Sequence, residues 1–233
     1  MSKTKIFEPF FGEFGWEIMS WAPICRKIAQ EYDESIITTF PGMEPLYQDF
    51  AKVITHNAVG RGLTYQKTYR VKSVGSFFKY GIPNEKYDLI IHARGASRKS
   101  NYNYKRWEEV VNALIPLGFK IAVVGSGQDM LLEGVSDERN IPLQELMNLL
   151  AGAKLLIGVS SGVMHLGASC GTNLVVWGDA RTYFGETLEK RYKDTWNPFE
   201  VDVGYLYDDN FQPYPHRIVE EVERCLKIKN MQR

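Results

Sequence analysis

Short apolar runs alternate with amphipathic segments through the second half of the chain, and this alternation restricts the fold more than any other feature. Three runs, Leu89–Ile91, Phe119–Val124 and Leu155–Val159, have the length of buried strands. Between them lie segments whose apolar residues recur every three or four positions, as on one face of a helix. This pattern predicts an α/β fold with a parallel sheet covered on both faces. Ligands of such sheets bind beyond the carboxyl ends of the strands.

The first half of the chain carries a shorter version of the same pattern. A strand at Ile6 and Phe7 leads through a glycine-rich loop into a helix, and Ser35–Phe40 and Val53–Thr55 predict two further strands. Residues 56–86 mix Gly, Lys, Tyr and Phe without a clean period. We therefore expect a second, smaller sheet and an irregular segment that covers a cleft or connects two domains.

Charge and cysteine content narrow the class of protein. The 28 Lys and Arg residues balance the 28 Asp and Glu residues, so the chain has no overall charge that favours a nucleic-acid backbone or an anionic membrane. Cys25, Cys170 and Cys225 are far apart and lack the paired spacing of a zinc site or a disulfide framework. We expect a reducing, cytoplasmic environment, and the absence of an 18-residue apolar run predicts no transmembrane segment.

Residues 155–178 read as a strand, a tight turn, a helix of small residues and a second strand. The N–H groups at the start of this helix, from Ser161 onward, would point at an anion such as a diphosphate, and Gly162 allows close approach of the backbone. Ser160 and Ser161 either donate to a phosphate oxygen or cap the helix. His165, one turn further, either donates to a phosphate or completes a buried hydrogen bond.

This stretch resembles the nucleotide-sugar site of the heptosyltransferase-like glycosyltransferases of family nine. Their pattern is a strand, Asp-Ser/Thr-Gly, a spacer, His-Leu, small residues, Gly-Thr/Asp-Pro, and a strand that ends in Gly. Ser160 stands where the family usually has Asp, and Asn173 where it often has Pro. The resemblance implies a GT-B-like fold with two Rossmann-like parallel-sheet halves and the donor site in the C-terminal half. We expect an acceptor-side domain at 1–85 and a donor-binding domain at 86–233.

The resemblance continues upstream over residues 91–107, which are similar to the family's strand, His-Pro-Gly-Ala-Ser loop and Lys-x-Trp helix start. Lys105 matches the family lysine that neutralises the donor phosphates. Fixed cations and hydroxyls in this loop would stabilise a leaving diphosphate, or they are solvated loop residues. The other predicted donors in the loop are Arg94, Ser97 and Ser100.

Two further positions are predicted to contact the nucleoside. The family places a backbone contact to the base at the position of Ile141, which otherwise reads as a packing residue. Asp129 follows a strand and a Gly-Ser-Gly turn, so it is a candidate acceptor for the ribose hydroxyls, although turns of this composition are common.

The loop Phe11–Glu17 resembles the family's Gly-Asp loop, whose acid is the general base toward the acceptor hydroxyl. Glu13 keeps the Gly-acid pair, whereas Glu17 lies six residues before Pro23 and matches the family's acid-to-proline spacing. A first-turn helix acid with a structural role is the alternative for either residue. We favour Glu13 slightly and keep both as catalytic candidates.

Together these features predict a glycosyltransferase that moves a sugar from a nucleotide-diphosphate sugar to a hydroxyl of a glycan or lipid-linked saccharide, and the resemblance implies inversion. No Asp-x-Asp follows a strand, so we predict metal-independent transfer with no cofactor beyond the donor. A glycosyltransferase of modified nucleic-acid bases that uses the Lys and Tyr residues of 61–80, and a nucleotide-sugar-binding protein without catalysis, remain alternatives.

Overall fold

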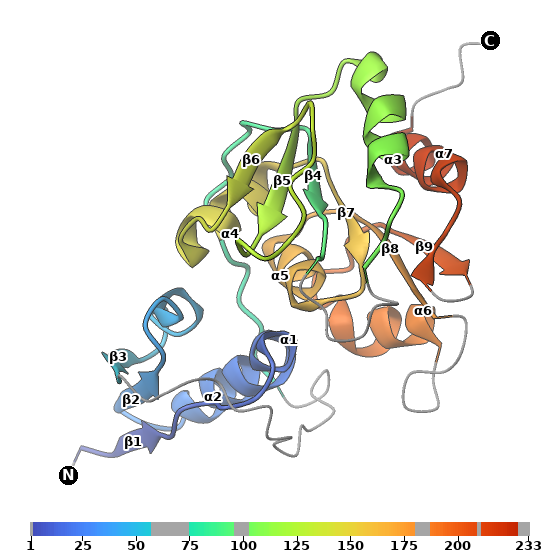
Figure 1. The fold of residues 1–233 in the computed structure, drawn as a ribbon. Coiled ribbons are helices and arrows are strands. Elements are labelled where there is room, and N and C mark those ends of the chain that lie inside the picture. Colours follow the sequence, from blue (N-terminus) through green and yellow to red (C-terminus); the bar gives the residue numbers. More distant parts are fainter. Residues whose placement is uncertain (1, 57–74, 96–102, 180–186, 209–210, 228–233) are drawn as a thin grey trace.

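The computed structural model is an α/β protein with two parallel sheets (Figure 1). The smaller sheet has the strand order β1-β2-β3, and the larger has the order β6-β5-β4-β7-β8-β9. Every pairing between these strands is parallel, which confirms the predicted fold class. The structure describes residues 2–56, 75–95, 103–179, 187–208 and 211–227.

The smaller sheet and its helices come from the first 56 residues. Residues 14–29 form one helical run, which widens into a π-helical turn just before Pro23. Proline has no N–H to donate, so the regular bond to the preceding turn is missing there. The elements are β1 (Thr4–Phe7), α1 (Phe14–Trp16), the π-turn η1 (Glu17–Trp21), α2 (Ala22–Ala29), β2 (Glu34–Thr39), the 3₁₀ turn η2 (Glu44–Leu46) and β3 (Lys52–Thr55).

The larger sheet begins at Leu89. Among the described residues no helix is long and apolar enough to cross a membrane. The elements are β4 (Leu89–His92), α3 (Trp107–Leu114), η4 (Ile115–Leu117), β5 (Ile121–Gly125), β6 (Ser136–Arg139), α4 (Leu143–Gly152), β7 (Leu155–Val159), α5 (Gly162–Cys170), β8 (Leu174–Asp179), α6 (Leu188–Arg191), the π-turn η5 (Tyr192–Trp196), β9 (Val203–Asp208) and α7 (Pro215–Cys225).

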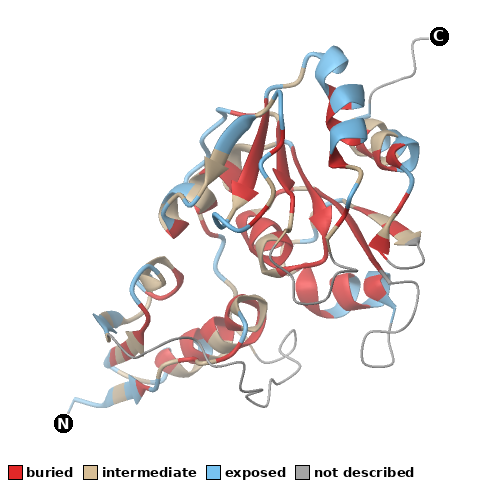
Figure 2. Ribbon diagram, viewed as in Figure 1, coloured by how far each residue is buried: buried red, intermediate tan, exposed pale blue. Residues whose placement is uncertain are grey.

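Helices cover both faces of the larger sheet, and its central strands are fully buried (Figure 2). Side chains alternate along a strand, so Leu89 and Ile91 of β4 point to one face and Ile90 points to the other. The first face packs against α3 and α7, and the second against α4 and α5. The hydrophobic cluster on this second face also contains Phe7 of β1, Ile18 of η1 and other residues of the N-terminal half, so one apolar core is shared by the two halves of the chain.

Arg26 ties the smaller sheet to the segment that leads into the larger one. Its guanidinium donates to both carboxylate oxygens of Asp49, at 2.6 and 2.9 Å, to the Ser76 carbonyl at 3.0 Å and to the Tyr80 hydroxyl at 3.1 Å. Residues 75–86 have no regular secondary structure, as the sequence suggested, yet this part of the segment is held by specific hydrogen bonds. The Tyr80 N–H, for example, donates to the Ser169 carbonyl at 3.1 Å.

Three elements of the larger half were not expected. The strand β6 has the sequence Ser-Asp-Glu-Arg and lies at the edge of the sheet, where charged residues replace the apolar signal of a buried strand. The strand β9, with the sequence Val-Gly-Tyr-Leu-Tyr-Asp, lies at the opposite edge of the sheet. The α6–η5 segment is a four-residue α-helix that continues as a π-helical turn, so its apolar spacing does not follow a 3.6-residue period.

Candidate functional site

The strand order of the larger sheet reverses between β4 and β7, because strands are added first on one side of β4 and then on the other. From β4 the chain continues through β5 to β6 on one side, and β7, β8 and β9 then fill the other side. His92 is the last residue of β4 and pairs with Gly158 in β7. A crevice forms beyond the strand ends at such a switch point, because the connections on its two sides run in opposite directions. The loops after β4, β5 and β7 therefore define the candidate site.

The helix α5 begins directly after β7 at this point. The Ser160 N–H donates to the Trp177 carbonyl, and the helical bonding starts with His165 N–H to the Ser161 carbonyl. The N–H groups of Gly162, Val163 and Met164, which come before His165, therefore have no acceptor within the helix. With the helix dipole, they give the start of α5 a partial positive charge of the kind that attracts anions.

Ser161 occupies the N-cap position but does not cap the helix with its side chain. Its hydroxyl lies 3.0 Å from Nδ1 of His92, and both residues are buried. Nε2 of the same imidazole lies 3.7 Å from Oδ2 of Asp129. The three side chains thus form a buried chain that joins the ends of β4, β5 and β7.

Asp129 is held in place by the loops around it. Its Oδ1 accepts from the Gly95 N–H at 3.0 Å, and its Oδ2 accepts from the Ser126 N–H at 2.7 Å and the Ser126 hydroxyl at 2.9 Å. Burial alone would raise the pKa of Asp129, but the interactions with His92, Gly95 and Ser126 together hold it well below its usual range. This carboxylate is therefore anionic at neutral pH and already has several donors.

His165 lies one turn into α5 and is buried against aromatic rings. Its ring centroid is 4.6 Å from that of Trp196 and 5.7 Å from that of Tyr192. Nδ1 of His165 has no hydrogen-bond partner within the described part of the chain. Burial lowers the pKa of this imidazole to about 3, so it is neutral at physiological pH.

The N-terminal loop lies directly on the start of α5 (Figure 1). A Cβ added to Gly162 would lie 2.8 Å from the Phe14 ring and 3.1 Å from the Gly15 nitrogen. A Cβ added to Gly15 would lie 2.9 Å from the His165 ring. Two glycines thus allow the two backbones to approach closely, and this contact brings the predicted acid-bearing loop to the predicted anion site.

The two acidic candidates of that loop differ in environment. Glu13 is exposed and precedes the first residue of α1. Glu17 is fully buried, and its Oε1 accepts a 2.5 Å hydrogen bond from the Tyr47 hydroxyl. Burial and the Glu17 carboxylate both raise the pKa of Tyr47 well above its usual value, so the phenol stays protonated as the donor.

The remaining predicted residues lie in the connections after β4 and β6 or outside the described residues. Arg94 is half-buried just after β4, and Lys105 is exposed before α3, where its N–H donates to the Gln212 side chain at 3.2 Å. Ile141 is half-buried against the shared apolar core. Ser97 and Ser100 fall in the residues that the structure does not describe.

His92 was not predicted as a site residue. It lies inside the segment that carries the family resemblance, where it aligns with the His of the family's loop. A polar residue at the end of an otherwise apolar strand next to a switch point is the signal that could have identified it. Its two partners come from segments 37 and 69 positions away, so no local pattern could have joined them.

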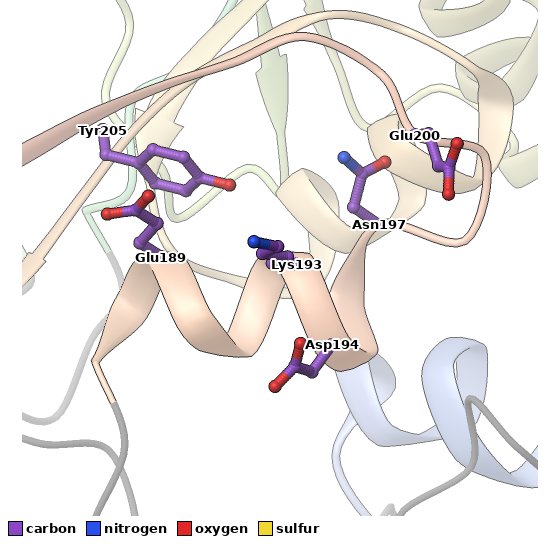
Figure 3. Close-up of a pocket in the computed structure, with 6 residues that line it drawn as sticks. All are labelled: Glu189, Lys193, Asp194, Asn197, Glu200 and Tyr205. Atoms are coloured by element: carbon purple, nitrogen blue, oxygen red, sulfur yellow. The ribbon is translucent and has the colours of Figure 1, made fainter.

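A pocket of about 410 Å³ lies between α6, η5 and β9. Figure 3 shows its lining residues, none of which is a predicted site residue. The residues that line this pocket are Glu189, Lys193, Asp194, Asn197, Glu200 and Tyr205.

Within the described ranges, no group of three or more His, Cys, Asp or Glu residues could hold a metal ion.

Comparisons with known proteins agree with this architecture. The family model for glycosyltransferase family 9 (heptosyltransferase) matches residues 66–204, which is more than half of the chain. A search of curated proteins found no match. A family 9 glycosyltransferase from Veillonella parvula superposes with a TM-score of 0.70 at 12% identity, over 97% of this chain and 98% of the other.

Two further solved structures have similar folds. The ADP-heptose lipopolysaccharide heptosyltransferase II of E. coli superposes with a TM-score of 0.67 at 12% identity, over 97% of this chain and 98% of the other. The iron-containing dodecameric glycosyltransferase TibC of enterotoxigenic E. coli has a TM-score of 0.58 at 16% identity, over 79% of this chain and 60% of the other. At these identities the similarity establishes the GT-B fold.

Proposed function

Because the chain belongs to glycosyltransferase family 9, the heptosyltransferase family, we propose that it moves a sugar from a nucleotide-diphosphate sugar to an acceptor hydroxyl, with inversion and without a metal ion. The observation that carries this proposal is the contact of the Glu13 loop with the start of α5. It brings a carboxylate-bearing loop and an anion-binding helix end together from the two halves of the chain. We assign residues 1–85 to the acceptor side and residues 86–233 to the donor side.

The donor diphosphate binds at the start of α5 in this proposal. The backbone N–H groups there and the hydroxyls of Ser160 and Ser161 donate to phosphate oxygens. Arg94 and Lys105 supply positive charge, and the neutral ring of His165 supplies a further nitrogen. These fixed dipoles and cations stabilise the charge that develops on the leaving diphosphate. They are the reason for proposing metal-independent transfer.

Glu13 is the proposed general base. It takes the proton of the acceptor hydroxyl while the hydroxyl oxygen attacks the anomeric carbon and the bond to the diphosphate oxygen breaks. A single displacement of this kind inverts the configuration at that carbon. The exposure of Glu13 supports this choice, because the fully buried Glu17 is already bonded to Tyr47. We therefore assign Glu17 a structural role.

The nucleoside lies toward the loops after β5 in this proposal. The backbone at Ile141 is the candidate contact for the base, and Asp129 remains the candidate for the ribose hydroxyls although its oxygens already accept several bonds. Solved structures with this fold contain ADP-D-β-D-heptose or ADP-2-deoxy-2-fluoro heptose. ADP-linked sugars are therefore the first donors to test, with a glycan or lipid-linked saccharide as the acceptor class.

The test is a thermal-shift screen of the purified protein against ADP-, UDP-, GDP- and CDP-linked sugars. A ligand that binds only the folded state stabilises it by about 2.7 kcal/mol at a hundredfold excess over Kd. We expect a shift with one base, and an affinity at least about tenfold weaker in Lys105→Ala, because a charged hydrogen bond contributes about 1.5–3 kcal/mol.

Lys52→Ala is the matched control, since this exposed lysine lies on β3 in the smaller sheet. It should leave the shift unchanged. A protein that shows no shift with any of these donors would contradict the proposed donor site.

A further inference from the structure

The hydrogen bonding among Asp129, His92 and Ser161 depends on which nitrogen of the His92 imidazole carries a proton. Asp129 carries its negative charge 3.7 Å from Nε2 of His92, which favours a proton on that nitrogen. In the neutral imidazole, Nδ1 is then an acceptor. The Ser161 hydroxyl, 3.0 Å away, must donate its hydrogen to Nδ1. In this state the Ser161 hydroxyl has no hydrogen left to donate to a ligand at the start of α5.

A diphosphate at the start of α5 favours the opposite arrangement. Phosphate oxygens are acceptors, so lone pairs on the Ser161 oxygen would repel them. If His92 also carries a proton on Nδ1, that N–H donates to the Ser161 oxygen, and the hydroxyl hydrogen is released to a phosphate oxygen. The imidazolium then lies between two anions, Asp129 and the diphosphate.

Given the proposed donor site, on which this inference rests, we propose that His92 is a positioning residue. It takes up one proton from solvent when a nucleotide-sugar diphosphate binds, and it thereby turns the Ser161 hydroxyl from a donor to His92 into a donor to phosphate. Asp129 holds the imidazole in the orientation that this exchange requires. One N–H bond forms at Nδ1, and no bond to carbon or phosphorus changes.

The packing around His92 supports a fixed imidazole. The exposed fraction of the side chain is 7% for both His92 and Asp129. The neighbouring strand β7 has Gly158 opposite, where an added Cβ would lie 3.4 Å from the His92 Cβ and 3.2 Å from its carbonyl oxygen. Gly158 thus lets the backbone of β7 approach His92 closely, and the low exposure of both side chains encloses the ring together with Asp129.

Several other titratable groups lie on the elements around the Asp129, His92 and Ser161 side chains. Arg94 follows His92 by two residues, His165 lies one turn into α5, and Glu13 precedes α1. His165 is neutral because burial lowers its pKa to about 3. Arg94 is a permanent cation, and Glu13 is exposed. His92 is the group that lies between the Asp129 carboxylate and the Ser161 hydroxyl, so we assign the proton to its imidazole.

The experiment is isothermal titration calorimetry with ADP-, UDP- and GDP-glucose at pH 7.5 in buffers of different ionisation enthalpy. The diphosphate of these probes is a diester with no proton that titrates near neutrality, so any uptake belongs to the protein. The wild type is expected to take up as much as one proton per bound donor. Its Kd should rise with pH, by up to tenfold per pH unit over the range in which the free imidazole is neutral and the bound imidazole is protonated.

His92→Asn separates this role from simple packing. The asparagine amide can donate to the Ser161 oxygen without taking up a proton, so we expect binding within about tenfold of the wild type and a Kd that does not depend on pH. His216→Asn is the matched control, because this exposed residue of α7 lies outside the site. It should keep the proton uptake of the wild type.

Nitrogen-15 NMR of the imidazole rings provides a second measurement on the unaltered protein, which serves if His92→Asn does not fold. Nδ1 of His92 should become protonated when the donor is added. Binding without proton uptake, or uptake that persists in His92→Asn, overturns this inference alone. A wild type that binds none of the probes refutes the proposed function and this inference with it.

Discussion

Burial of His165 without a hydrogen-bond partner for Nδ1 among the described residues predicts a specific loss of stability in acid. Burial lowers the pKa of this imidazole to about 3 in the folded chain, whereas the pKa of an unfolded histidine is about 6.5. The unfolded state therefore binds more protons between these two values. The stability contributed by the neutral ring is fully present above pH 6.5 and is lost as the pH falls toward 3.

The magnitude follows from the size of the shift. Each pH unit below 6.5 costs about 1.4 kcal/mol, so the free energy of unfolding should fall by about 2 kcal/mol between pH 8 and pH 5 through this group. His165→Phe removes the titration and keeps an aromatic ring against Trp196, which lies 4.6 Å away between centroids. The difference between wild type and variant isolates the effect, because the other histidines remain in both proteins.

The assay is urea unfolding of both proteins at pH 8, 7, 6 and 5, in a range where most carboxylates stay ionised. We expect the wild type to lose about 2 kcal/mol more than His165→Phe by pH 5, with nearly all of this difference developing below pH 6.5. Parallel pH profiles for the two proteins would refute the reasoning, since they would mean that folding does not suppress the protonation of His165.

Four further substitutions test the site and the framework. Glu13→Gln should lower kcat by about 10²–10⁴-fold with little change in donor affinity, whereas Glu17→Gln should lower stability. Steady-state release of nucleoside diphosphate measures the first effect and urea unfolding measures the second. The reverse result would make Glu17 the base. Arg26→Ala should cost about 2–4 kcal/mol in urea unfolding, because it leaves a partly buried carboxylate without its guanidinium, and a loss below about 1 kcal/mol would contradict this. An added Cβ on Gly152 would lie 2.2 Å from the Asn84 carbonyl oxygen, so Gly152→Ala should lose about 2 kcal/mol although alanine favours helix; a stabilised variant would show that the backbone yields.

The fold could be predicted where burial leaves a simple pattern. β4, β5 and β7 are covered on both faces, so their sequences are continuous apolar runs with few alternative structures. The edge strand β6 could not be predicted, since Ser-Asp-Glu-Arg is a polar sequence whose strand structure depends on pairing with β5. Local propensity does not contain that tertiary contact.

The candidate site could be predicted as far as its segments, but not its internal contacts. The resemblance pointed to the Glu13 loop and to the start of α5, and the structure brings these together through Gly15 and Gly162. The sequence could not distinguish the exposed Glu13 from the buried Glu17, because that difference depends on Tyr47 from another segment. It also could not show that the Ser161 hydroxyl contacts His92 in place of its own helix.

The strand order of the larger sheet also has a consequence for synthesis. β4 pairs on one side with β7, and the paired residues His92 and Gly158 are 66 positions apart. At about 5–20 residues per second, a ribosome needs roughly 3–13 s to make that interval. During this time β4, which is apolar from Leu89 to Ile91, has an unpaired edge, which is a template for association with other nascent chains. We therefore expect the yield of soluble protein to depend more on expression rate and temperature than on the stability of the finished fold.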